Sequence, residues 1–122
     1  MSEELSPEQR EIAIKWKDEI NKGIKDKEVR AGELREKIEE FKFKIDIFCR
    51  IRDLIKDEMS ECKESIHPQR LKQCLDKVDE EKGSLKKQLE KTREERLNLE
   101  IELIIGRLKL FFLKKDLEEK SG

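Results

Sequence analysis

The chain has 122 residues, of which 48% are Asp, Glu, Lys or Arg and 34% are hydrophobic, and its formal net charge is −1. Ordinary globular domains are about 45–50% apolar and about 25% charged, so this composition disfavours a compact globular core and is typical of long solvated helices. The 29 basic and 30 acidic residues are interspersed along the chain. This pattern argues against nucleic-acid binding, which needs a basic face or run.

A helix is predicted over residues 7–66, after a short tail at 1–6. Ser6 can cap this helix, Pro7 suits its first position, and Gln9 completes the spacing of a capping box. Apolar residues then alternate steps of three and four, with Arg52 as the polar exception. We call this set the first core row: Ala31, Leu34, Ile38, Phe41, Ile45, Phe48, Arg52, Ile55, Met59, Cys62 and Ile66. Exposed pairs such as Glu40 with Lys44 have the order that supports a helix.

The residues from Phe41 to Phe48, taken alone, alternate as a half-buried strand would. The three-four spacing continues on both sides of them, and a lone strand would have no partner. We therefore predict helix for this segment too.

Pro68 predicts a turn at residues 67–70, because proline disfavours helix in the residue before it and suits a new helix start. A second helix is predicted over 71–118, followed by a tail at 119–122. Its apolar spacing passes through Gly83 without a change of phase. We call this set the second core row: Leu71, Leu75, Val78, Lys82, Leu85, Leu89, Thr92, Arg96, Leu99, Leu103, Gly106, Leu110, Leu113 and Leu117.

The two core rows predict an all-α fold, an antiparallel two-helix coiled-coil hairpin that a second copy or a partner completes into a larger helical bundle. If Ile66 meets Leu71 across a short turn, the residue numbers of facing pairs add to 137. Shifts by seven residues would keep the same kind of pairing but would need a different turn. The 137 pairing predicts these contacts: Arg52 with Leu85, Ile38 with Leu99, Ala31 with Gly106, and Ile24 with Leu113.

Both predicted helices have more apolar residues than a hairpin can bury, and we expect these to bind partner helices. Between Leu97 and Leu113, eleven of seventeen residues are apolar. The predicted partner-binding residues are Phe43, Ile47, Ile51 and Leu54 in the first helix, and Leu97, Ile101, Ile105, Leu108 and Phe112 in the second. The alternative is that they are scattered exposed residues with no function.

Trp16 belongs to a segment with a different spacing. Ile12, Trp16, Ile20 and Ile24 step by four, which predicts a local irregularity near residues 21–24. The 137 pairing also leaves residues before about Trp16 beyond the end of the second helix. Trp16 is predicted either to pack on the open end of the hairpin or to anchor a partner.

No catalytic, metal or cofactor site is expected. His67 lies near Cys62 and Cys74, but the spacing matches no common zinc pattern. One histidine, no tyrosine and five dispersed glycines provide neither a nucleophilic triad nor a phosphate-binding loop.

The sequence also predicts a cytoplasmic or nuclear location. The start of the chain is acidic and polar, unlike a signal peptide, and the most apolar stretch, Leu103 to Leu113, is too short to span a bilayer. The odd number of cysteines, Cys49 included, fits a reducing compartment.

These features predict a non-enzymatic structural subunit or adaptor that binds helices of a cytoskeletal, centromeric, ciliary or trafficking assembly. The alternatives are a homodimeric four-helix bundle with a regulatory role, a parallel dimer of one long helix kinked at Pro68, and a peripheral protein on a membrane surface.

Overall fold

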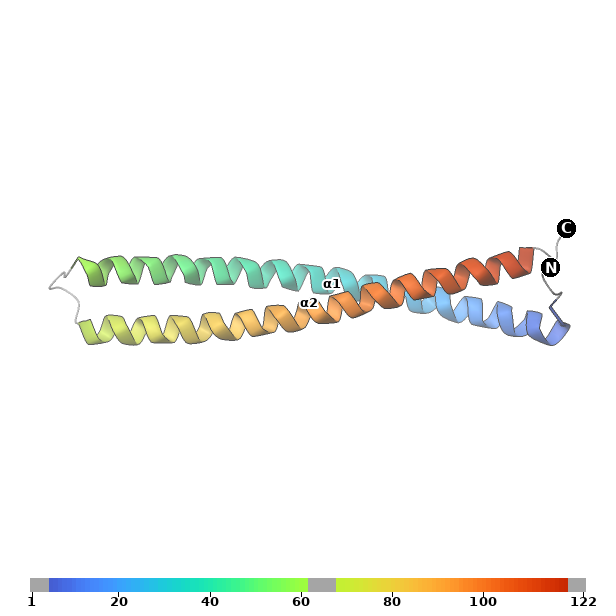
Figure 1. Ribbon diagram of the computed structural model, residues 1–122, viewed down its shortest axis with the longest axis horizontal. Helices are drawn as coiled ribbons and strands as arrows, with labels where there is room; N and C mark the ends of the chain where they lie inside the picture. The colour runs from blue at the N-terminus through green and yellow to red at the C-terminus, as the bar shows by residue number, and fades with distance from the viewer. Residues whose placement is uncertain (1–4, 62–67, 119–122) are drawn as a thin grey trace. The chain divides into compact units, whose positions relative to one another are not determined.

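The computed structural model describes residues 5–61 and 68–118, and in these ranges the chain forms two α-helices and no strand. Helix α1 spans Pro7–Ser60 and helix α2 spans Pro68–Glu118. They pack against each other in opposite directions (Figure 1), which confirms the predicted all-α helical hairpin. The segment from Phe41 to Phe48 is helical, so the strand alternative is wrong.

The predicted capping box is formed at the N-terminus of α1. The backbone N–H of Gln9 donates to Oγ of Ser6 over 3.1 Å, and the backbone N–H of Ser6 donates to Oε1 of Gln9 over 3.0 Å. Each side chain thus satisfies a backbone group that the helix itself leaves without a partner.

Replacing Ser6 by alanine is expected to lower the free energy of unfolding by about 1 kcal/mol, because the backbone N–H of Gln9 loses its acceptor. Urea denaturation followed by circular dichroism would measure the change. Replacing exposed Ser84 by alanine is the control, since Ser84 is inside α2 and caps no helix. Equal destabilisation by the two changes would contradict the capping role.

The helix boundaries around the connection differ from the predicted ones. Helix α1 ends at Ser60, whose hydroxyl donates to the carbonyl of Asp57 over 2.9 Å, and Glu61 follows in a turn. The predicted end at residue 66, including Cys62 and Ile66 of the first core row, lies outside the described residues. Helix α2 begins at Pro68, inside the predicted 67–70 turn, because proline suits the first helical position.

The hairpin divides into two compact units, one made of Met1–Glu33 with Arg96–Gly122 and the other of Leu34–Glu95. In both units the described members of the core rows are buried or half-buried, except Met59, which is 37% exposed. The most deeply buried apolar residues include Ala13, Leu103 and Leu110 in the first unit, and Leu34, Ile38 and Leu89 in the second. The heptad spacing therefore identified the core of each unit correctly.

The pairing of the helices differs from the predicted one by one heptad. In the first unit Gly106 lies against Ile24, since a Cβ atom at Gly106 would be 3.3 Å from Cγ1 of Ile24. The 137 pairing places Ala31 opposite Gly106 and Leu113 opposite Ile24, and both assignments are wrong. The residue numbers of facing pairs add to about 130.

The second unit has the same pairing. Nε of Arg52 donates to Oδ1 of Asp79 over 2.7 Å, so Arg52 lies at the level of Val78 and Asp79 and not at that of Leu85. A shift by seven residues exchanges equivalent heptad positions, and it leaves the same side chains buried.

The shift also brings the segment before Ile20 onto α2. Ala13 is only 6% exposed and Lys17 is half-buried, so α1 packs on α2 from Ala13 onward and not only from Trp16. With Lys17 and Lys27 counted, the three-four spacing runs from Ala13 into the first core row without an irregularity. Nζ of Lys27 lies 3.7 Å from Oε2 of Glu102. The methylene groups of the Lys27 side chain therefore lie along the edge of the core, while its charged end pairs with Glu102.

The predicted surface pair of Glu40 and Lys44 is formed. Nζ of Lys44 lies 2.8 Å from Oε1 of Glu40, and this hydrogen bond and charge lower the pKa of the Glu40 carboxyl. Both side chains are exposed, so the pair contributes little to stability.

Candidate functional site on the outer face of α2

Large apolar side chains cover the face of α2 that points away from α1. Each is between 47% and 59% exposed. We call this set the outer face: Leu97, Ile101, Ile104, Ile105, Leu108, Phe111 and Phe112.

The spacing of α2 explains why one helix has two apolar sides. Leu99, Leu103, Gly106 and Leu110 occupy the core positions of the heptad. The residues of the outer face occupy the three heptad positions farthest from that core, and they repeat at steps of three and four in the same way. A helix that is apolar on two opposite sides is typical of the interior of a bundle.

Trp16 of α1 borders the outer face. A shallow hollow of about 370 Å³ lies between Trp16 and α2, and its lining residues on α2 include Ile105, Leu108 and Phe112. Nζ of Lys109 lies 5.6 Å from the centre of the indole ring, within the range of a cation–π contact. Trp16 is still 44% exposed. The structure thus brings Trp16 together with three of the predicted residues of α2.

The predicted partner-binding residues of α1 belong to the unit Leu34–Glu95, which is described by itself. Phe43 and Leu54 are 66% and 63% exposed, whereas Ile51 is 37% exposed and Ile47 is half-buried. This set is smaller and less continuous than the outer face of α2.

The sequence prediction missed two members of the outer face, Ile104 and Phe111. It followed a single three-four row along α2, while the exposed face is two rows wide. The signal that could have found them is the heptad itself, because both residues occupy the position that follows the core residues Leu103 and Leu110. Other exposed apolar residues are Ile12, Ile14 and Val29 of α1.

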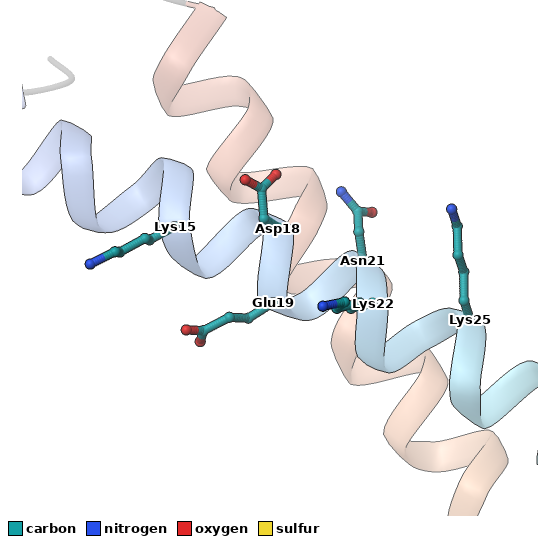
Figure 2. Close-up of a pocket in the computed structure, with 6 residues that line it drawn as sticks. All are labelled: Lys15, Asp18, Glu19, Asn21, Lys22 and Lys25. Carbon is teal, nitrogen blue, oxygen red and sulfur yellow. The ribbon is translucent and has the colours of Figure 1, made fainter.

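A polar hollow of the first unit lies along α1 (Figure 2), and Lys15, Asp18 and Lys25 are among the residues that line it. The side chains of Asp18 and Lys25 point to the same side of the helix and that of Lys15 points in another direction, so the three charged groups do not meet at one point. In the described residues, no group of three or more His, Cys, Asp or Glu side chains could hold a metal ion. His67 and Cys62 lie outside these residues. Neither described helix has a segment long and apolar enough to cross a membrane.

Comparisons with protein-family models, with curated proteins and with solved structures find no match to this chain.

Proposed function

We propose that this protein is a non-enzymatic structural subunit or adaptor that binds helices of partner proteins through the outer face of α2. The observation that carries the proposal is the arrangement of seven large, exposed apolar side chains on one side of α2, opposite its buried core. Contiguous apolar surface of this size on a protein marks an interaction site more often than chance exposure.

The shape of the surface favours a helix as the bound element. Side chains spaced by three and four residues form ridges and grooves that match those of another helix. The hollow between Trp16 and Phe112 can receive a side chain of such a helix. Tryptophan and phenylalanine at a groove are frequent anchors of protein interfaces.

The edges of the outer face argue against a lipid surface as the first choice. Glu100 and Glu102 border the face, and their side chains are 49% and 54% exposed. Helices that rest on membranes usually have a Lys- and Arg-rich polar side, since the lipid surface is anionic. Carboxylates in this position oppose such binding.

Photo-crosslinking in cells would test the proposal. A benzoylphenylalanine residue placed at Ile105 or Leu108 is expected to form crosslinks to helical segments of protein, because both side chains would be covered by the bound helix. The same residue at exposed Lys86, which lies outside the outer face, is the control. Crosslinks to lipid alone, or equal labelling from all three positions, would overturn the proposal.

A further inference from the structure

We propose that the helix bound to the outer face is α2 of a second copy of this chain, packed antiparallel about a twofold axis that passes between Ile104 and Ile105. This inference rests on the proposed function, since it names the occupant of the same surface. Three properties of the outer face support it: its apolar pattern, its charges and its area.

The apolar side chains are arranged so that the face matches its own reverse. When α2 meets an antiparallel copy about this axis, Ile101 lies opposite Leu108 of the second copy and Leu97 lies opposite its Phe111. Ile104 and Ile105 each lie beside their own equivalents, on opposite sides of the contact. Phe112 meets Asn98 at the end. Every apolar member except Phe112 therefore has an apolar neighbour, as a twofold interface requires.

The charges at the edges favour the same orientation. Glu100 and Glu102 precede the axis, and Arg107 and Lys109 follow it. In heptad positions, Glu100 shares one edge of the face with Arg107, and Glu102 shares the other edge with Lys109. An antiparallel copy places each glutamate beside a basic residue of the other chain, whereas a parallel copy places like charges together. Opposed charges of this kind select the orientation more than they add affinity.

These charged groups already have partners within the hairpin, and they stay accessible. Glu102 lies 3.7 Å from Lys27, and Arg107 lies 3.3 Å from Glu28. The side chains of Glu102 and Arg107 are 54% and 59% exposed, so a second copy can approach them without breaking these pairs. The difference in charge between the two halves of the face extends along α2. Four glutamates and one arginine occur between residues 94 and 102, and four basic residues with no acid occur between 107 and 115.

The exposed apolar area is of the size that a dimer interface uses. Seven large apolar residues, each about half exposed, together expose on the order of 800 Å² per copy, and a specific interface covers about 600 Å² or more of each partner. A face that is apolar at its centre and charged at both edges has the anatomy of such an interface.

Light scattering combined with gel filtration of the full chain tests the association. The measurement is made at about 50 μM, a concentration at which a dimer with a micromolar dissociation constant is formed. The measured mass is expected to be twice the chain mass of 14.6 kDa. Replacing Ile104 by glutamate is expected to raise the dissociation constant about 100-fold or more, because the twofold axis puts two carboxylates side by side. Val29→Glu is the matched control, since Val29 is a similarly exposed apolar residue of the same unit and lies outside the outer face. Circular dichroism should show both variants as helical as the parent.

Cysteine crosslinking tests the orientation of the two copies. The background is a chain whose Cys49, Cys62 and Cys74 are replaced by alanine and whose mass in light scattering equals that of the parent. Ile104→Cys is expected to form a disulfide with its own copy. Ile101→Cys alone should not form one, because the two copies of residue 101 lie seven residues apart along the helix, about 10 Å, on opposite sides of the twofold axis. An equal mixture of Ile101→Cys and Leu108→Cys should crosslink.

The outcomes separate this inference from the proposed function. A monomer at about 50 μM, where a micromolar dimer would form, overturns the second copy as occupant. A dimer that Ile104→Glu leaves intact overturns it as well, and self-crosslinking of Ile101→Cys overturns the antiparallel orientation. In all three cases the proposed function stands if photo-crosslinks from Ile105 reach another protein, and it falls with the inference if they do not.

Discussion

Replacing Leu34 by alanine is expected to lower the free energy of unfolding by about 3 kcal/mol, within the range measured for buried leucines. Leu34 is 1% exposed and is the most deeply buried side chain of the described core. The loss combines the hydrophobic free energy of the missing atoms with the cost of a cavity that two helices cannot fully close. The largest stability effect is expected here because Leu34 is so fully buried and a two-helix core has few neighbouring side chains that could move into the cavity.

Urea denaturation followed by far-UV circular dichroism would measure this change, with the parent and the variant both in an Ile104→Glu background so that association does not contribute. Phe43→Ala is the control, because Phe43 is 66% exposed and its loss is expected to change stability by no more than about 0.5 kcal/mol. Similar losses for the two variants would mean that the core is not where the burial pattern places it.

Replacing Gly106 by leucine is expected to destabilise the hairpin by about 2 kcal/mol, because the added side chain meets Ile24. A Cβ atom alone would lie 3.3 Å from Cγ1 of Ile24, which is closer than an ordinary contact, and 3.4 Å from its Cδ1. Leucine favours a helix over glycine by nearly 1 kcal/mol, and the steric cost exceeds this gain. Gly83→Ala is the contrasting change, expected to stabilise by up to about 1 kcal/mol, since nothing lies within 4 Å of a Cβ atom there.

A second substitution turns this result into a measurement of the helix pairing. Ile24→Ala is expected to be less destabilising in the Gly106→Leu chain than in the parent, because the two residues share one space, and a double-mutant cycle would give the coupling. If Ala31→Gly restored stability and Ile24→Ala did not, the helices would pair one heptad away from the observed arrangement.

The core of each unit could be predicted from the sequence, whereas the pairing of the helices could not. Heptad spacing specifies which side of a helix is buried, as Leu34, Leu89 and Leu103 show. It does not specify which layer faces which, because a shift by seven residues exchanges equivalent positions and buries the same residues. The predicted pairing depended on a short turn after Ile66, and α1 ends at Ser60.

The first part of the core escaped prediction because lysines occupy two of its positions. Lys17 and Lys27 interrupt the apolar spacing, so the steps of four from Ile12 to Ile24 are the pattern that the apolar residues show. In the structure Ile12 is 64% exposed and Ala13 is buried. A long side chain can fill a core position with its methylene groups, so the spacing of the apolar residues alone does not include such a position.

The candidate site was predicted in position but not in width. All five predicted residues of α2 belong to the outer face, and Ile104 and Phe111 extend it to a second row. The width matters physically, because one row gives a narrow stripe and two rows give a surface broad enough to seat another helix.

The separation along the chain between paired side chains has a consequence for the order of folding. Arg52 and Asp79 are 27 residues apart, whereas Glu28 and Arg107 are 79 residues apart. Closing the longer loop first would cost about 1 kcal/mol more chain entropy, so we expect the contacts near Arg52 and Asp79 to form before those near Glu28 and Arg107. The contacts of Trp16 with α2 are then expected among the last to form, and the fluorescence of the chain's single tryptophan would follow this late step.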